Sequence, residues 1–504
     1  MKRISTTIAI LALAAFGLQA QDKTYFVSPD GNDNADGLSV SNAWKSIDKV
    51  NASVFQAGDR VLFEGGATFY GNLIIKSSGS PEKPIVFSGY GQGRPVINMG
   101  KEEGTAITIL NSDGLEIVGF EITSGFPPEV GVGRNGILID EKEPGRAFSH
   151  IVIKDNYIHD IWGQMGGTRL RCAAISGGVV RPWRGFPSPQ NFSTLEDVLI
   201  EGNRIERVDK VGITTTGIDK LRVRRNYMDN LGGDGIIVSS SFRAIVEFNE
   251  IHRSCMRSGL PDLPGDNGWA EKGEGWWPHT AACWIIGCEE TIMQFNEVYD
   301  TGRQIRNGDG FAYDFDFYCK RCIAQYNYSK ENHGFLLMMY DIFENVARYN
   351  ISENDKTHLV QMQGSLKSDN NVLYNNVFYV DHGVSEVEYF RGDHPEKAKD
   401  INDLGAHFYN NIFYATGQGQ FRTAWSVGFA WDRSFDDTLK PDLPAGSLFL
   451  NNCYFGPWKN GIPDDPKAIV ADPKFVDPGT GGTGLGTLKG YMLQKDSPCI
   501  NAGT

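Results

Sequence analysis

One short pattern of apolar and polar positions recurs along most of the chain. An alternating apolar run is followed by Asn, by one further residue and, as a rule, by another apolar residue, as in IVIKDNYI (151–158) and AIVEFNEI (244–251). The sixth position of the pattern holds Asn156, Asn203, Asn226, Asn249, Asn296, Asn327, Asn350, Asn376, Asn411 and Asn452. Successive Asn residues are 47, 23, 23, 47, 31, 23, 26, 35 and 41 positions apart. The repeating unit is therefore about 23 residues long, and in places it is doubled or lengthened by an insertion.

Several units continue with a second short strand that begins with Gly. These strands are GILID (136–140), GITTT (212–216), GIIVS (235–239), GFAYD (310–314) and GFLLM (334–338). Short strands at this spacing, with the same polar residue at one bend, are typical of a parallel β-helix, whose coils stack about 4.8 Å apart. Stacked Asn amides can donate and accept hydrogen bonds along the axis. We therefore predict an all-β fold: a single right-handed parallel β-helix, that is, a solenoid with an Asn ladder and long loop insertions.

The four longest interruptions of the repeat fall at 162–193, 254–281, 383–405 and 415–446. Insertions in a solenoid project from one edge, where they form the walls of a groove. The second insertion carries three residues suited to sugar binding, namely Trp276, Trp277 and His279. Exposed indole rings suit the apolar faces of sugars, whereas buried ones pack an insertion onto the helix body. The sequence leaves both interpretations open.

Acidic and aromatic residues alternate in the segment 307–317. Its aromatic positions are Phe311, Tyr313, Phe315 and Phe317. Side chains along a strand point alternately to opposite faces, so these rings are predicted to share one face, and that face is expected to be the core. Unpaired carboxylates in the core would cost several kcal/mol. Asp314 and Asp316 are therefore expected to point to solvent, with Asp309 in the preceding turn.

The spacing of Asp314 and Asp316 suggests a catalytic role. Two residues on one strand face lie about 6.6 Å apart along the chain. Carboxyl groups of inverting glycosidases are roughly 6.5–9.5 Å apart. One acid of such a pair keeps its proton through like-charge repulsion and donates it to the leaving oxygen, while the other activates water. The alternative is a solvated polar face or a cation site.

The next coil places further polar groups beside this pair. The alternation predicts that Tyr340 faces outward near Asp316, and Asp341 follows at the bend. These residues extend the candidate site by one coil.

Cations and imidazoles also surround the acidic segment. Arg303 and Arg306 precede it and either bind a uronate or sulfate group or neutralise the carboxylates. His333 and His358 lie in turns one coil apart and are expected to line the same edge. His333 is a candidate general base and His358 a candidate substrate-binding residue.

The amino-terminal segment indicates export. Lys2 and Arg3 precede an apolar run at 8–18, and Ala20 offers a small residue for cleavage. Residues 1–20 are therefore predicted to be a signal peptide and residues 21–504 the β-helix domain, which is periplasmic or secreted and not inserted in a membrane. The net charge of −14 argues against nucleic acid as a partner. A monomer is expected.

The chain contains eight Cys residues. Cys319 and Cys322 have CxxC spacing, but no second ligand pair stands at a spacing suited to zinc, and a thioredoxin-like setting is absent. We expect a local disulfide or two free thiols here, and neither a metal nor another cofactor.

Both ends of the predicted domain resemble a known group. The segments 25–34 and 57–63 resemble the opening, and the segments 471–475 and 497–503 the closing, of the pectate-lyase-like superfamily of β-helix proteins. The chain also looks somewhat like glycoside hydrolase family 141. The resemblance implies a carbohydrate partner, since this superfamily includes lyases, hydrolases, epimerases and binding proteins.

Three functions follow as hypotheses. The first is a glycoside hydrolase that cleaves a poly- or oligosaccharide with Asp314 and Asp316, and with Asp309 or Asp341 as a third acid. The second is a polysaccharide lyase or uronate dehydratase acting by β-elimination, with its base and cation drawn from Arg303, Arg306, His333, Tyr340 and His358. The third is a carbohydrate-binding β-helix without catalysis.

Overall fold

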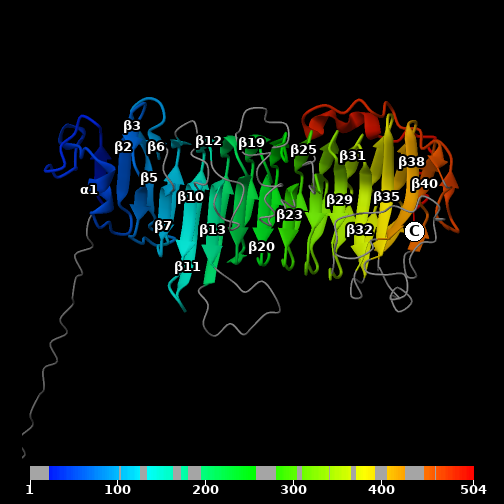
Figure 1. Ribbon diagram of the computed structural model, residues 1–504, viewed down its shortest axis with the longest axis horizontal. Coiled ribbons are helices and arrows are strands. Elements are labelled where there is room, and N and C mark those ends of the chain that lie inside the picture. Colours follow the sequence, from blue (N-terminus) through cyan, green and yellow to red (C-terminus); the bar gives the residue numbers. More distant parts are fainter. Residues whose placement is uncertain are drawn as a thin grey trace, which may run out of the picture.

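Three long parallel sheets wind around a common core in the computed structural model (Figure 1). The structure describes residues 22–100, 104–124, 133–162, 172–179, 194–256, 280–302, 309–339, 341–364, 370–391, 406–425, 448–459 and 461–503. The predicted signal peptide, residues 1–20, lies outside these ranges. Each coil contributes one strand to each sheet in turn, so the predicted parallel β-helix is confirmed.

Within the described residues the sheets, here named A, B and C, hold 15, 14 and 13 strands. Sheet A contains β1 (Thr24–Val27), β2 (Arg60–Glu64), β5 (Ile85–Tyr90), β8 (Leu115–Val118), β11 (Ala147–Lys154), β14 (Thr194–Glu201), β17 (Ile218–Asp219), β18 (Arg222–Arg224), β21 (Ile245–Glu247), β24 (Ile292–Gln294), β27 (Ile323–Gln325), β30 (Val346–Arg348), β33 (Asn371–Tyr374), β36 (Ala406–Tyr409) and β39 (Leu448–Leu450). Sheet B contains β3 (Thr68–Tyr70), β6 (Val96–Asn98), β9 (Glu121–Thr123), β12 (Tyr157–Ile161), β15 (Arg204–Val208), β19 (Tyr227–Leu231), β22 (Glu250–His252), β25 (Glu297–Tyr299), β28 (Tyr328–Lys330), β31 (Ile351–Glu353), β34 (Val377–Val380), β37 (Ile412–Ala415), β40 (Cys453–Phe455) and β42 (Ile469–Val470).

Sheet C contains β4 (Leu73–Ile75), β7 (Gly104–Leu110), β10 (Arg134–Glu141), β13 (Cys172–Val179), β16 (Val211–Thr216), β20 (Ile236–Ser239), β23 (Ala281–Ile286), β26 (Phe311–Phe315), β29 (Gly334–Met338), β32 (His358–Gly364), β35 (Val384–Arg391), β38 (Gln418–Trp425) and β41 (Trp458–Lys459). Helical turns lie near the two ends of the described chain: η1 (Val40–Asn42), α1 (Ile47–Asn51) and η5 (Leu485–Tyr491). No helix among the described residues is long and apolar enough to cross a membrane.

The Asn ladder forms along the turn between sheets A and B. Each of the ten predicted Asn residues donates from Nδ2 to the Oδ1 atom of the next one, over 2.9–3.1 Å, except the last, Asn452, which donates to Asp465. Asn156 bonds directly to Asn203, although 47 residues separate them. Long separations are therefore single coils with insertions, and the prediction that some units are doubled is wrong.

The predicted insertions also prove to be interrupted by regular strands. The ranges 162–193, 383–405 and 415–446 contain β13, β35 and β38, which all belong to sheet C. The repeat pattern does not identify these strands, because the sequences of the strands lack its Asn. In chain order, the parts that lie outside the described residues, such as 180–193 and 257–279, follow or precede a strand of sheet C.

Aromatic rings form a second ladder beside the Asn side chains. Phe248, Phe295, Tyr326 and Tyr349 each precede a ladder Asn and adopt a left-handed backbone with φ near 56°. Their rings stack with centroids 5.0–5.1 Å apart and nearly parallel planes. A left-handed conformation is unfavourable for a bulky residue, so stacking between coils offsets part of this local strain.

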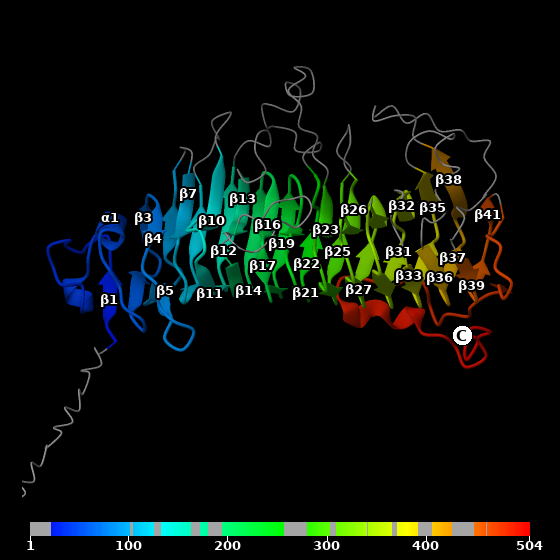
Figure 2. The ribbon, with the colours of Figure 1, turned by 90° about the horizontal axis from the view of Figure 1, so that it is seen from below.

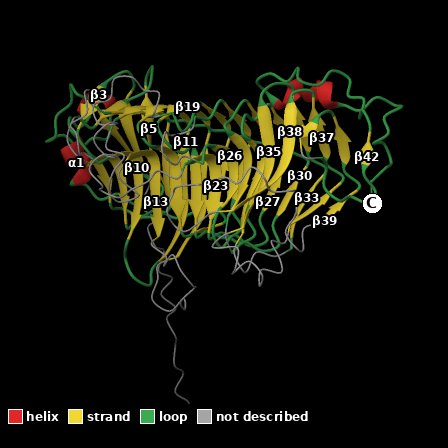
Figure 3. Ribbon diagram, turned by 45° about the vertical axis from the view of Figure 1, so that its right-hand side comes forward, coloured by secondary structure: helices red, strands yellow, loops and turns green. Residues whose placement is uncertain are grey.

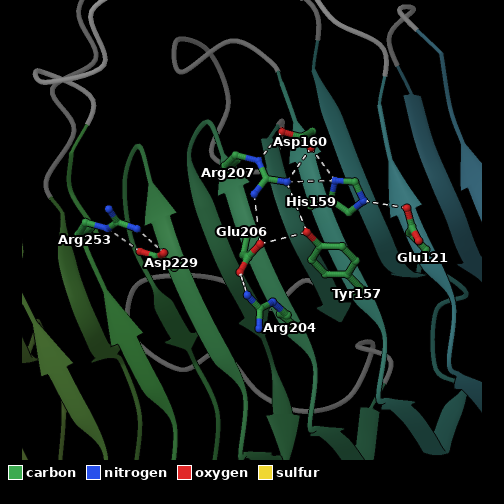
Figure 4. A network of polar contacts seen from close by, with 9 residues as sticks. All are labelled: Glu121, Tyr157, His159, Asp160, Arg204, Glu206, Arg207, Asp229 and Arg253. Atoms are coloured by element: carbon green, nitrogen blue, oxygen red, sulfur yellow. Dashed lines mark hydrogen bonds and ion pairs between the residues drawn. The ribbon is translucent and has the colours of Figure 1, made fainter. Parts of the chain in front are cut away.

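The outer face of sheet B carries a network of ion pairs (Figure 4). Arg207 donates from Nε and Nη2 to the two carboxylate oxygens of Asp160, over 2.7 and 2.9 Å. His159 lies between Asp160 and Glu121, at 2.6 and 3.2 Å. Burial raises the pKa of Asp160, but the hydrogen bonds from Arg207 and His159 outweigh it and leave the pKa below its usual value. These charges satisfy one another and join successive coils.

Glu141, at the end of β10, is a buried acid without a compensating cation in contact. It is 1% exposed, Oε1 accepts the Ser112 N–H at 3.2 Å, and Oε2 has no hydrogen-bond partner. Burial above all, together with Asp113, raises the pKa of Glu141 from 4.5 to about 8. The folded state thus favours the protonated acid. Its contribution to stability is complete below pH 4.5 and is lost as the pH rises toward 8.

Glu141→Gln is therefore expected to stabilise the protein at neutral pH. The amide keeps the shape of the acid and needs no proton, whereas keeping Glu141 protonated at pH 7, above its ordinary pKa of 4.5, costs about 3 kcal/mol. Urea unfolding at pH 4.5 and pH 7.5 tests this, with a gain at the higher pH only. Glu143→Gln is the matched control, since this side chain is 54% exposed. An equal gain at both pH values would contradict the assigned cause.

Candidate active site

Strand β26 shows that the predicted aromatic face is only partly correct. Tyr313 and Phe315 lie in the main core, as expected. Phe311 instead belongs to a separate cluster with Ala281 and Leu337, whereas Ala312 is in the main core. Ala312 and Tyr313 both contact the core, so the alternation is broken between them. The predictions for Phe311 and Phe317 are wrong, because Phe311 follows the turn at Gly310, whose φ is +66°, and Phe317 is half-buried in the turn after the strand. Strict alternation does not hold at strand ends.

Asp314 lies on the outer side of sheet C, but it does not reach solvent. It pairs in register with Trp284 of β23 and Leu337 of β29, which form the cluster outside the main core. The residue is 4% exposed and its Oδ1 atom has no hydrogen-bond partner. The prediction of a solvent-facing Asp314 is therefore wrong. The outer face of a sheet can itself be covered, which a strand pattern does not reveal.

The surroundings of Asp314 favour the neutral form of its carboxyl group. Burial raises the pKa of Asp314 well above its ordinary value, and the charges of Asp316, Asp309 and Asp234 raise it further. Burial disfavours the charged form, and nearby like charges act in the same direction. These four acids thus form one electrostatically coupled group, here named the carboxylate cluster. Clusters of this kind, with one neutral member, are frequent at sites of acid–base chemistry.

Asp309 and Asp316 are the more accessible members at the two ends of β26. Both are half-buried, and Asp316 lies just after the strand, where its Oδ1 accepts the Phe317 N–H at 2.7 Å. Gly310, next to Asp309, has φ +66°, and a Cβ there would lie 2.9 Å from the Cβ of His333. Only glycine fits this turn without strain, so Gly310 fixes the position of Asp309 against the next coil.

Asp234 and Trp284 were not predicted. Asp234 accepts hydrogen bonds from the Trp284 indole at 2.8 Å and from the Ala281 N–H at 3.1 Å. Burial raises the pKa of Asp234 to about 6, although these hydrogen bonds oppose the rise. A sequence signal existed, because Gly-Asp-Gly occurs at 233–235 as well as at 308–310. Trp284 is half-buried, and its position beside Asp314 offers an apolar ring next to the acids.

His333 and His358 lie together, as predicted. Their ring centroids are 5.9 Å apart, and Phe311 stacks on His358 at 5.6 Å. Thr357 Oγ1 lies 3.1 Å from Nδ1 of His333. Since Phe311 and Asp314 share β26, the imidazoles are near the amino-terminal end of the same strand.

Six predicted site residues lie outside the described residues: Trp276, Trp277, His279, Arg303, Arg306 and Tyr340. Asp341 lies in the turn after β29, and it is not among the acids that raise the pKa of Asp314. In the described part of the chain, no group of three His, Cys, Asp or Glu side chains is arranged to hold a metal ion.

The fold has known counterparts. Residues 96–268 match a family model described as a right handed beta helix region. The fold is a right-handed parallel β-helix. A lacto-N-biosidase of Bifidobacterium longum is 26% identical over 95% of this chain, which spans about a third (34%) of that protein's length.

Solved structures show the same architecture. The crystal structure of GH136 lacto-N-biosidase from Eubacterium ramulus has a TM-score of 0.58 and 23% identity, over 71% of this chain and 64% of that one. Its selenomethionine derivative gives a TM-score of 0.59 and 21% identity, over 78% and 67%. The chain is thus similar in sequence and fold to lacto-N-biosidases, and it covers about two thirds of the solved ones.

Proposed function

We propose that the protein is an exported glycoside hydrolase that cleaves an oligosaccharide at the carboxylate cluster on the outer side of sheet C. The observation that carries the proposal is the buried Asp314, whose pKa is raised by burial and by neighbouring acids, two residues before the half-buried Asp316. Glycosidases need one carboxyl group that donates a proton and one that is ionised. The similarity to lacto-N-biosidases supports hydrolysis of an oligosaccharide as the reaction.

Spacing divides the roles within the cluster. Asp309 lies at the opposite end of β26 from Asp316, too far away for these two acids to flank one glycosidic bond. Residues two apart on a strand lie about 6.6 Å apart, so we assign the chemistry to Asp314 and Asp316. Asp316 accepts a backbone N–H, which favours a carboxylate, and it acts as the nucleophile or as the base for water. Asp314, whose Oδ1 atom has no hydrogen-bond partner, donates its proton to the leaving oxygen. Asp309 is a positioning residue whose charge helps to raise the pKa of Asp314.

The second and third hypotheses lack a comparable observation. The cations proposed for β-elimination, Arg303 and Arg306, and the proposed Tyr340 lie outside the described residues. A purely binding role does not explain why the chain keeps a buried acid at Asp314, because burying an unpaired carboxyl group costs free energy. Hydrolysis is therefore the function that the described side chains support best.

Product analysis tests the proposed reaction. The protein is incubated with a panel of neutral and uronate-containing oligosaccharides, including ones that contain lacto-N-biose. A new reducing end without ultraviolet absorbance is expected, because hydrolysis forms no double bond. An unsaturated product would show β-elimination instead, and binding without turnover across the panel would favour the non-catalytic alternative.

Trp284→Ala is expected to weaken substrate binding. The indole ring lies beside Asp314 and offers an apolar face to a sugar, so its removal should raise KM about tenfold and change kcat much less. Trp284→Phe keeps an aromatic ring and should show a smaller rise in KM. Tyr70→Ala is the control, since this ring is 75% exposed and belongs to β3 of sheet B. Unchanged KM in Trp284→Ala would exclude the ring as a sugar platform.

A further inference from the structure

The chain after β42 folds back along the outer face of sheet B. Figures 1 and 2 show this segment, which includes η5, lying against strands of earlier coils. The Tyr491 hydroxyl donates to Glu353 Oε2 at 2.7 Å, and the Gly484 N–H donates to Glu297 Oε2 at 2.8 Å. Glu353 is fully buried and forms an ion pair with Lys330 at 2.7 Å. The segment 471–503, here named the C-terminal strap, therefore covers part of sheet B.

Two cysteines meet where the strap leaves the last coil. Cys453 lies on β40 and is 2% exposed, and Cys499 lies in the strap. Both belong to one apolar cluster, together with Phe475 and Tyr491. The two thiols lie close enough for each to shift the pKa of the other. The strap thus places a second sulfur directly against the sulfur of the last coil.

Cys499 differs from the other thiols in its accessibility. It is half-buried, whereas Cys172, Cys255, Cys283, Cys288, Cys319, Cys322 and Cys453 are buried. All eight thiols are free in this structure, so the local disulfide considered for Cys319 and Cys322 is not formed in it. Reactivity toward an oxidant requires access to the sulfur atom. Cys499 is therefore the thiol at which oxidation can begin.

We propose that Cys453 and Cys499 form a disulfide bond that locks the C-terminal strap onto the last coil when the protein meets a small disulfide oxidant. In the structure both thiols are free and belong to the same apolar cluster, so the strap already holds Cys499 beside the last coil. The bond joins residues 46 positions apart and closes the strap into a loop.

Thiol–disulfide exchange with oxidised glutathione gives a balanced reaction. The Cys499 thiolate attacks one glutathione sulfur and releases a glutathione thiolate. Cys453 then gives its proton to solvent base and attacks the Cys499 sulfur, which expels the second glutathione. The neighbouring Cys453 thiol and Ser497 lower the pKa of Cys499, although burial opposes them. The neighbouring Cys499 and burial raise the pKa of Cys453, so Cys499 is the thiol that reacts first.

Mass spectrometry tests the proposal directly. The protein is equilibrated with reduced or oxidised glutathione, alkylated, digested and analysed without reduction. The oxidised sample is expected to contain the Cys453 and Cys499 peptides joined by a disulfide bond. The mass of the joined pair should be two hydrogens below the sum of the two free peptides. Cys319 and Cys322 are an internal control, since they are also in contact but buried, and they should stay reduced. A lasting glutathione adduct on Cys499, another pairing, or two free thiols after oxidation would overturn the proposal.

Limited proteolysis shows whether the bond holds the strap. Cleavage within 471–503 should release a fragment from reduced protein and be at least about tenfold slower in oxidised protein, since cross-linking a loop of this size opposes its opening. Cys499→Ser should abolish the difference, and Cys255→Ser, a change at a buried thiol elsewhere, should not. Equal rates in oxidised and reduced wild-type protein would contradict the locking role. Both tests are independent of catalysis, so they separate this inference from the proposed hydrolysis.

Discussion

Asp316→Asn is expected to reduce kcat by about a thousandfold or more while the protein stays folded. An amide cannot act as a nucleophile or accept a proton from water, yet it has the size of the acid. The backbone hydrogen bond from Phe317 can still reach the remaining carbonyl oxygen. Kinetics on the substrate found in the oligosaccharide panel measure the loss, and thermal unfolding checks the fold.

Asp309→Asn and Asp314→Asn complete the comparison. Asp314→Asn should cause a loss of similar size, because Asp314 is the proposed proton donor and an amide has no acidic proton to give. Asp309→Asn should keep activity within about tenfold at neutral pH, since Asp309 acts only through its charge. Its pH profile should fall earlier at the alkaline side, because removal of that charge lowers the pKa of Asp314.

These three variants can contradict the assignment in separate ways. An active Asp314→Asn beside an inactive Asp309→Asn would make Asp309 the proton donor instead of the buried residue. Full activity in all three would remove the carboxylate cluster from the reaction. Either result would leave the β-helix and its ladder unaffected.

Asn296→Ala is expected to destabilise the protein by about 3–5 kcal/mol. Asn296 is fully buried, and its Oδ1 accepts both the backbone N–H and Nδ2 of Asn249, at 3.1 and 2.9 Å. Its own Nδ2 donates to Val246 O at 2.9 Å and to Asn327 at 3.1 Å. Alanine leaves these groups buried without partners, and each one costs about 1–3 kcal/mol.

Urea unfolding measures this loss. Asn34→Ala is the control, because Asn34 is exposed in the loop after β1, and a change within about 0.5 kcal/mol is expected. A stability for Asn296→Ala within the same margin of the wild-type value would show that the ladder contributes little. Figure 3 shows how the strands stack along the axis, so the loss of one amide affects the coils on both sides.

The acidic segment illustrates how far a local pattern can go. The alternation at 309–317 correctly placed Tyr313 and Phe315 in the core and Asp314 on the outer side. It placed Phe311 on the wrong side and Asp314 in solvent. Exposure depends on what covers the outer side of a sheet, and that is decided by other parts of the chain.

The sequence by itself determined the coil and the ladder. Each coil repeats the same local pattern, with apolar residues toward the core and an amide at one bend. Every repeat therefore predicts the same structure. Only the tertiary structure decided the composition of the site. Asp234 and Asp314 are 80 positions apart and meet across β23 because coils stack at right angles to the chain direction. Stacking of this kind leaves no spacing signal, and the pKa of Asp314 depends on burial and on charges from two coils.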